Sequence, residues 1–109
     1  MNVENKVWLD DQIDDANTPM RHPPTGWIGV KSALSACRLL ARGGVVEISL
    51  DHDLGDGQMS GYVVARFIEK RAYEGRLHPI RWTIHSANPV GMGNMRSALQ
   101  AAERFWQKV

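Results

Sequence analysis

Three aspartates that follow apolar runs are the residues of this sequence best suited to bind a metal ion. Asp10 and Asp11 come directly after residues 7–9, and Asp51 follows the β-branched run 45–50. Carboxylates gathered without compensating bases repel one another and raise a pKa unless a cation neutralises them. Mg²⁺ or Mn²⁺, which prefer oxygen ligands, suit such a set. The sequence therefore predicts a divalent metal site formed by Asp10, Asp11 and Asp51, although any one aspartate alone is also typical of a turn.

Two histidines stand at the same kind of position and could transfer protons. His52 follows Asp51 directly, and His85 follows the apolar run 80–84. An imidazole titrates near neutral pH, so one ring could accept a proton while the other donates one, as phosphodiester cleavage requires. We group Asp53, from the same acidic turn, with His52, His85 and Asp51 as candidate catalytic residues. The alternative is that a strand-end histidine only forms surface hydrogen bonds.

A third set of residues could hold the oxygens of a phosphate. Two of them precede a predicted helix start, where a hydroxyl, an amide and free backbone N–H groups come together. Two helix residues and a loop arginine could reach the same phosphate. The candidate substrate-binding residues are therefore Ser86, Asn88, Arg21, Asn94 and Arg96. A helix-entry turn with solvated side chains is the alternative interpretation.

The elements that must position these residues alternate between strand and helix. Strands are predicted over 3–9, 45–50 and 80–85, with a short edge strand over 27–30. Helices are predicted from Ser32 to Gly43, over 62–73 and over 91–107, and a proline-containing loop over 10–25. Short strand–helix alternation selects a parallel sheet with right-handed crossovers, so the fold class is α/β. The carboxyl ends of neighbouring parallel strands would bring the polar residues to one crevice.

The bulk properties exclude several classes of protein. The 109 residues suffice for one core, so residues 1–109 are expected to form a single domain. The net charge is +1, and the acidic and basic residues are spread along the chain. Neither a membrane nor duplex DNA is therefore an expected partner. Without an apolar run of membrane-spanning length or a signal peptide, a cytoplasmic location is expected. The single Cys37 lies on a helical apolar pattern and is interpreted as a buried, inert thiol. The oligomeric state is left open.

Several ordered motifs together resemble the cyclic-phosphate processing receiver-like family over nearly the whole chain. They are Trp8-Leu9-Asp10-Asp11, Arg21-His22-Pro23-Pro24, Ser49-Leu50-Asp51-His52-Asp53-Leu54-Gly55, Gly61-Tyr62, and His85-Ser86-Ala87-Asn88-Pro89-Val90-Gly91 through Asn94-Met95. The resemblance implies a small flavodoxin-like or receiver-like three-layer fold with a mostly parallel sheet of about four strands. By the same resemblance, Asp10 and Asp11 match the acidic pair of receiver domains, Asp51 the phosphoacceptor, and Ser86 the hydroxyl after the fourth strand.

The resemblance implies a metal-dependent phosphoesterase that acts on the cyclic phosphate of nucleotides or RNA ends. The chain departs from signalling receivers, since loop 12–25 replaces the first helix and no fifth strand carrying the receiver's lysine can be placed after His85. It also departs from the family, with a longer loop after Asp11 and with Met92 where a more polar residue is expected. The alternative is a degenerate receiver-like module that binds a phosphorylated ligand or a protein partner without turnover. A passive module would not need the two histidines, which favours the enzyme.

Overall fold

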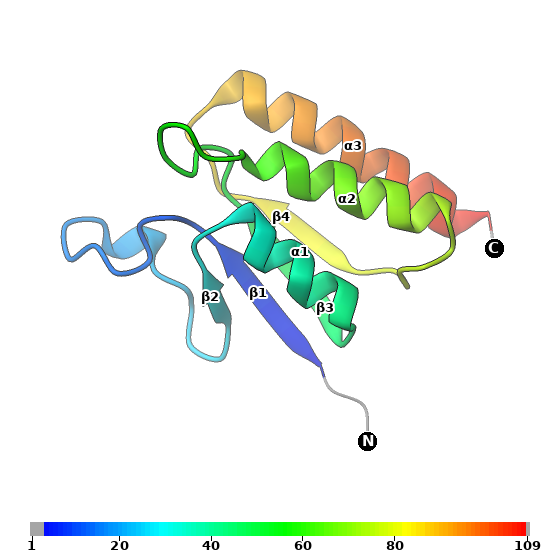
Figure 1. Ribbon diagram of the computed structural model, residues 1–109, viewed down its shortest axis with the longest axis horizontal. Helices are drawn as coiled ribbons and strands as arrows, with labels where there is room; N and C mark the ends of the chain where they lie inside the picture. The colour runs from blue at the N-terminus through cyan, green and yellow to red at the C-terminus, as the bar shows by residue number, and fades with distance from the viewer. Residues whose placement is uncertain (1–3, 109) are drawn as a thin grey trace.

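The computed structural model describes residues 4–108, which form a four-stranded sheet and three α-helices (Figure 1). The strands are β1 (Asn5–Leu9), β2 (Ile28–Val30), β3 (Val45–Leu50) and β4 (Arg81–Ile84). The helices are α1 (Ala33–Arg42), α2 (Gly61–Tyr73) and α3 (Pro89–Gln107), with one 3₁₀ turn, η1 (Pro19–Arg21). Every predicted element is present, although Val3, the predicted start of the first strand, lies outside the described residues. The α/β class is confirmed.

The sheet has the strand order β2-β1-β3-β4, and all its pairs are parallel. The predicted parallel neighbours and the predicted edge strand are thus both confirmed. Leu9 pairs in register with Leu50, and Leu50 pairs with Ile84. Because the three strands end level with one another, the residues that follow them meet at one edge of the sheet.

The three helices lie on one face of the sheet, so the described residues form two layers and not the three that were expected (Figure 1). The crossovers β2-α1-β3 and β3-α2-β4 advance in the same direction across the sheet, and right-handed crossovers then place both helices on the same face. The step from β1 to β2 runs in the opposite direction and would place a helix on the other face. That connection holds Pro19, Pro23 and Pro24 and forms only η1, because proline disrupts a helix interior.

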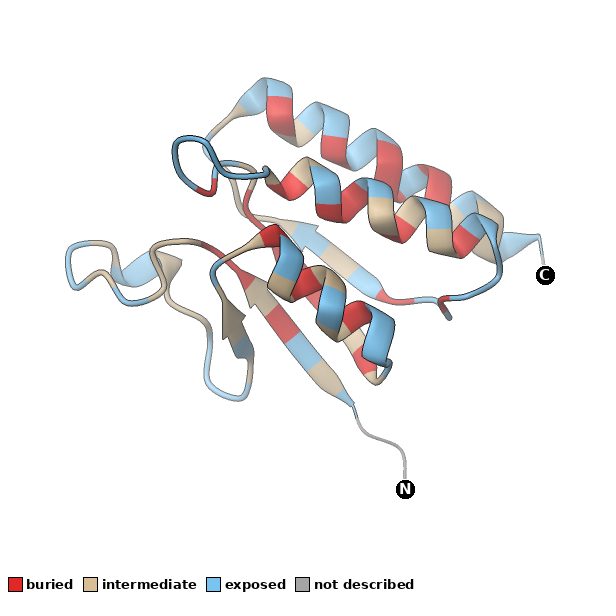
Figure 2. Cartoon of the chain, in the orientation of Figure 1, coloured by how far each residue is buried: buried red, intermediate tan, exposed pale blue. Residues whose placement is uncertain are grey.

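The core lies between the sheet and the helices, where buried residues line the inner side of each helix (Figure 2). Side chains alternate across a strand, so Val7, Leu9, Ile48 and Leu50, all 0% exposed, contact this core. The residues between them face the other side of the sheet, which carries a row of three charged residues in register: Lys6, Glu47 and Arg81. Alternation of this kind is expected of a sheet with only one apolar cover.

The helix starts are capped by side chains that the sequence places directly before them. Ser32 accepts a hydrogen bond from Ser35 N at α1, and Asn88 Oδ1 accepts one from Gly91 N at α3. The third helix begins two residues earlier than predicted, at Pro89. Proline suits the first helical position because an N–H there would have no partner within the helix, so its absence costs nothing. Among residues 4–108, no helix is long and apolar enough to cross a membrane.

Candidate functional site

The acid cluster consists of Asp10, Asp11 and Asp51, and it lies where β1 and β3 end. Asp10 and Asp51 are 0% and 2% exposed, and Asp11 is partly buried. The backbone holds them in place, since Asp51 N donates to Leu9 O at 3.0 Å, between the two strands. One carboxylate oxygen of each aspartate lies within 4.8 Å of the others. The predicted convergence of these three aspartates is therefore observed.

Arg21 inserts its guanidinium into the acid cluster. Its Nε lies 2.8 Å from Asp10 Oδ2, and its Nη2 pairs with Asp51 and lies 3.6 Å from Asp11 Oδ1. Its Nη1 donates to Gln12 Oε1 at 2.9 Å. The sequence interpretation gave Arg21 to a phosphate, whereas the structure places it among the carboxylates, because the turn η1 lies beside their edge of the sheet.

Two opposing effects set the pKa values of the cluster: burial of the charged groups, and the ion pairs between Arg21 and the aspartates. Desolvation raises the pKa of Asp51 to about 6, although the positive charge of Arg21 acts to lower it. The hydrogen bond to Asp10 raises the pKa of Arg21 against the opposing effect of its own burial. Three carboxylates share one arginine, so the cluster keeps an excess of negative charge when all its groups are ionised.

The acid cluster fits a divalent metal ion. Its donors are all oxygens, the chemistry that Mg²⁺ and Mn²⁺ prefer, and they converge closely enough to share one ion. The guanidinium among them shows independently that this position favours a cation. The residues that would hold the ion are the three aspartates predicted from the sequence.

His85 lies over the sheet face opposite the helices and reaches back to the acid cluster. Its ring stacks on Trp8, with centroids 3.9 Å apart and an interplanar angle of 12°. Its Nδ1 is 2.7 Å from Ser49 Oγ, and its buried Nε2 is 3.2 Å from Asp10 Oδ2, off the line of a hydrogen bond. Desolvation lowers the pKa of His85, although the negative charge of Asp10 raises it.

His52 reaches the same edge from the helix side of the sheet. Its ring packs against Gly91 in the first turn of α3, so closely that a Cβ at Gly91 would overlap it. Its Nδ1 lies 2.9 Å from Asp53 Oδ1, and this hydrogen bond lowers the pKa of Asp53. The two predicted histidines therefore flank the strand ends from opposite faces.

Ser86 and Asn88 are near the site, but most of their polar atoms have partners. Ser86 Oγ accepts from Asn88 N at 3.2 Å, and Asn88 Oδ1 caps α3. The Asn88 side chain also lowers the pKa of Asp53 through a hydrogen bond. Ser86 lines the cleft described below, whereas Asn88 organises the turn that leads into α3.

Asn94 and Arg96 are not brought to the acid cluster. Asn94 lines a separate hollow between α2 and α3 with Tyr62 and Arg66. Arg96 is exposed, and it lies about 10 Å along the helix from Pro89 at a rise of about 1.5 Å per residue. The sequence interpretation treated these residues as able to reach back because they follow the helix start. The axial rise of the helix carries them away from it.

A cleft of about 400 Å³ opens beside the acid cluster. Its polar lining comes from the predicted site, and its apolar lining from η1 and the end of β4. The lining residues are Met20, Arg21, Asp51, Asp53, Ile84, His85, Ser86 and Ala87. A substrate in this cleft would contact carboxylates, a guanidinium, an imidazole and a hydroxyl together. That imidazole belongs to His85, whereas His52 stands next to the cleft in sequence and does not line it.

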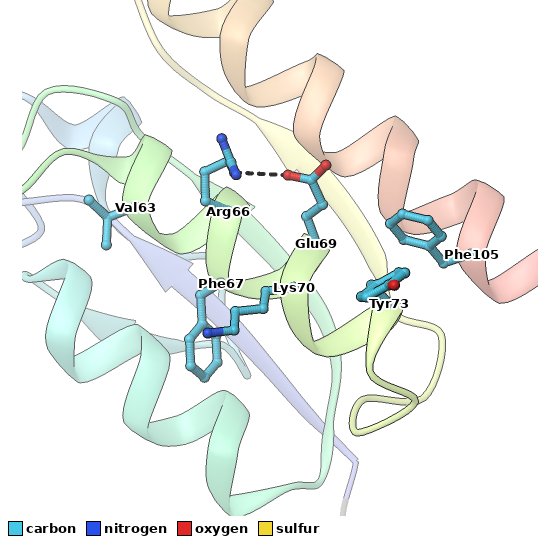
Figure 3. Close-up of a pocket in the computed structure, with 7 residues that line it drawn as sticks. All are labelled: Val63, Arg66, Phe67, Glu69, Lys70, Tyr73 and Phe105. Carbon is cyan, nitrogen blue, oxygen red and sulfur yellow. Dashed lines mark ion pairs between the residues drawn. The ribbon is translucent and has the colours of Figure 1, made fainter.

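A larger hollow, of about 500 Å³, lies on the surface of α2 and contains none of the predicted site residues (Figure 3). Tyr73 and Phe105 face each other at one end, with ring centroids 5.2 Å apart. Arg66 and Glu69 form an ion pair across a single helical turn. This arrangement is an exposed helix surface with no convergent catalytic groups.

Sequence reasoning assigned no functional part to Trp8, Ser49 and Thr83, which the structure connects to His85. The three residues pair in register across β1, β3 and β4, and Thr83 Oγ1 donates to Ser49 Oγ at 2.8 Å. One signal was present in the sequence, since Ser49 is a polar residue within an apolar strand. Only the strand register shows that it lies beneath a histidine from another strand.

The comparisons with known proteins agree with this geometry. A family model described as the cyclic-phosphate processing receiver domain matches residues 5–101. No curated protein and no solved structure is significantly similar to the chain. The matched segment runs from β1 into α3, so it contains the acid cluster and both histidines together with the parallel sheet that positions them. The chain is therefore a member of the cyclic-phosphate processing receiver domain family.

Proposed function

We propose that this protein is a metal-dependent phosphoesterase that opens the cyclic phosphate of a nucleotide or of an RNA end. The observation that carries the proposal is the cleft in which Arg21, Asp51, His85 and Ser86 meet beside the other two aspartates. Family membership ties the domain to cyclic-phosphate processing. Hydrolysis is the proposed form of that processing.

The arrangement of the histidines supports a displacement at phosphorus. In the proposed reaction, a water oxygen forms a bond to phosphorus, and the bond from phosphorus to one ring oxygen breaks. The water loses a proton to one neutral imidazole, and the leaving oxygen gains a proton from the other ring in its imidazolium form, which becomes neutral. Attacking and leaving oxygens stand in line on opposite sides of the phosphorus, and His52 and His85 likewise flank the strand ends from opposite faces.

The remaining polar groups would bind and orient the phosphate. Asp10, Asp11 and Asp51 would hold Mg²⁺ or Mn²⁺, which when bound supplies a positive charge that polarises a phosphoryl oxygen. The Ser86 hydroxyl lines the cleft and would donate to a phosphate oxygen. Some of the carboxylate oxygens that now pair with Arg21 would bind the metal ion instead, and the guanidinium N–H groups set free in this way would contact the phosphate.

The test is a substrate screen with the purified protein. ³¹P NMR would follow 2′,3′-cyclic mononucleotides, RNA with a 2′,3′-cyclic phosphate end and 3′,5′-cyclic nucleotides, each with Mg²⁺, with Mn²⁺ and with EDTA. We expect a phosphomonoester signal to appear with metal for one of these classes and to disappear with EDTA. Cyclic phosphate that stays intact in every reaction would refute the proposed hydrolysis.

A matched pair of variants distinguishes a specific role of the acid cluster in turnover from a general effect of removing one negative charge. Asp51→Asn removes a charge that is 2% exposed and belongs to the cluster, whereas Asp56→Asn removes one from the exposed neighbouring loop. We expect the first variant to lose at least about a hundredfold in turnover, a typical effect of removing a group that acts on the transition state. The second variant should keep wild-type turnover.

Arg21 supports a second candidate function, a receiver-like module that binds a phosphorylated ligand or protein without turnover. Its guanidinium partly neutralises the carboxylates from within the chain, so the site can be held together without metal. Under this alternative, the cyclic nucleotides would bind in titration calorimetry and remain unchanged in ³¹P spectra. Binding followed by ring opening would instead support the enzyme.

A further inference from the structure

The two imidazoles of the site use the same ring nitrogen, Nδ1, for different kinds of hydrogen bond. In His52, Nδ1 lies 2.9 Å from Asp53 Oδ1. An ionised carboxylate can only accept, so the ring must donate and Nδ1 carries the proton. Among the described residues no group bonds to Nε2 of His52, and in the neutral ring this atom holds a lone pair.

His85 has the opposite arrangement. Its Nδ1 lies 2.7 Å from Ser49 Oγ, which itself accepts a hydrogen bond from Thr83 Oγ1 at 2.8 Å. The hydroxyl of Ser49 therefore has its own proton available for the ring, and Nδ1 accepts it. The neutral ring must then carry its proton on Nε2.

The surroundings of Nε2 in His85 lead to the same assignment independently. Asp10 Oδ2 lies 3.2 Å away, and the nitrogen is buried. A lone pair on Nε2 would face the negative oxygen, whereas an N–H presents a positive end to it. Stacking on Trp8 holds the ring plane in place. Within that plane, a 180° rotation about the Cβ–Cγ bond would put carbon atoms where the two nitrogens stand, so it would break the contacts with Ser49 and Asp10.

We propose that Asp53 and Ser49 are positioning residues that hold the two neutral imidazoles in opposite tautomers. His52 is protonated on Nδ1 and offers a lone pair on Nε2, whereas His85 is protonated on Nε2 and accepts from Ser49 through Nδ1. The consequence for the reaction rests on the proposed function. His52 is the ring that can take the proton of the attacking water, while neutral His85 offers only an N–H toward the acid cluster.

The tautomers can be measured without any substrate. Long-range ¹H–¹⁵N spectra of protein labelled at histidine, recorded near pH 8 where an ordinary imidazole is neutral, distinguish a protonated ring nitrogen from an unprotonated one. His52→Gln and His85→Gln assign the signals. We expect a protonated Nδ1 in His52 and a protonated Nε2 in His85, with and without Mg²⁺. The same tautomer in both rings, or the reverse assignment, would overturn the proposal.

Matched variants test the two positioning residues separately. Asp53→Ala should convert His52 from the pure Nδ1–H form to a mixture, while Asp56→Ala, on the same exposed loop, should leave it unchanged. Ser49→Ala should move the Nδ1 resonance of His85 toward that of an unbonded nitrogen. Thr83→Val should leave that resonance unchanged, because it removes a hydroxyl from the same row of hydrogen bonds but keeps Ser49, the residue that donates to His85. Ser49→Thr, which keeps a hydroxyl at this position, should give the wild-type resonance. Unchanged spectra in Asp53→Ala or Ser49→Ala would contradict the assigned role.

Failure of this inference and failure of the proposed function give different results. The expected tautomers in a protein that opens no cyclic phosphate would refute only the hydrolysis. Turnover by a protein whose rings show the reverse tautomers would refute only the assignment of the rings.

Discussion

Arg21 joins three carboxylates from two strand ends and so controls the charge of the site. Its side chain is 29% exposed, whereas Asp10 and Asp51 are almost fully buried. A divalent cation and the guanidinium would bind to the same three carboxylates, so an entering ion competes with Arg21 for them. The metal affinity of the protein is therefore expected to depend on a residue that is not a metal ligand.

Arg21→Ala should tighten Mg²⁺ binding by about tenfold, which corresponds to about 1.4 kcal/mol. The reason is that the entering ion no longer has to displace charged hydrogen bonds, which are typically worth about 1.5–3 kcal/mol. Titration calorimetry measures the change, and Arg96→Ala, an exposed arginine away from the cluster, is the control. An affinity that is equal or weaker in Arg21→Ala would contradict the competition.

Arg21→Ala should also destabilise the metal-free protein, by about 1–3 kcal/mol in urea unfolding. Breaking a fully buried ion pair costs about 3–5 kcal/mol, and the partial exposure of Arg21 reduces that figure. Saturating Mg²⁺ should recover most of the loss, because the ion replaces the missing positive charge. A variant as stable as the wild type without metal would show that the ion pairs contribute nothing.

Cys37 should react slowly with a disulfide reagent in the folded protein. Burial raises the pKa of this thiol, so less of the reactive thiolate is present at pH 8 than in a free cysteine. The rate measured with Ellman's reagent should rise on unfolding in urea and, in the folded state, should increase as the pH is raised from 8 to 9. Reaction at the rate of a free thiol would show that the side chain is accessible and not inert.

At the scale of elements, the close packing of α3 against the end of β3 determines the position of His52. Gly91, in the first turn of α3, contacts the His52 ring directly, whereas a Cβ added at Gly93 in the same helix would meet nothing within 4 Å. The two glycines thus share a helix and differ only in what lies beside them.

Gly91→Ala should destabilise the protein by about 1–3 kcal/mol and displace His52, because the new methyl group needs space that the ring occupies. Gly93→Ala should stabilise the protein by up to about 1 kcal/mol, since alanine favours a helix and no clash opposes it. Urea unfolding measures both effects, and the His52 ring signals report the displacement. Equal stability of the two variants would exclude the predicted clash.

At the scale of the whole molecule, the acid cluster couples metal binding to folding. Asp51 is far along the sequence from the adjacent pair Asp10 and Asp11, and the three carboxylates converge only when β1 and β3 pair. An ion bound only by the folded state adds about 2.7 kcal/mol at a concentration of 100 Kd. For a domain of about this size, each kcal/mol raises the melting temperature by roughly 4–8 °C.

Mg²⁺ should therefore raise the melting temperature by more than about 10 °C at saturation, and EDTA should reverse the shift. Asp51→Asn should lose most of the shift, whereas Asp56→Asn should retain it, because only the first belongs to the acid cluster. Differential scanning calorimetry measures the effect. An identical shift in both variants would place the ion elsewhere on the protein.

Local patterns in the sequence were enough to predict the elements and the acid cluster. Apolar runs followed by Asp10, Asp51 and His85 predicted strand ends, and parallel pairing then required those ends to share one edge. The helix start after Ser32 and the proline-containing loop were also readable, because capping and proline effects act within a few residues.

Only the tertiary structure decided which partners the site residues have. Arg21 reaches the carboxylates because η1 folds back beside the sheet, and Ser49 lies beneath His85 because of the register between β3 and β4. The single layer of helices likewise follows from the direction of each crossover across the sheet. The sequence by itself determined which chemical groups stand at the strand ends, since that depends on local periodicity. Their pairing, their charge and the atom through which each imidazole bonds depend on contacts between distant segments, which exist only in the folded chain.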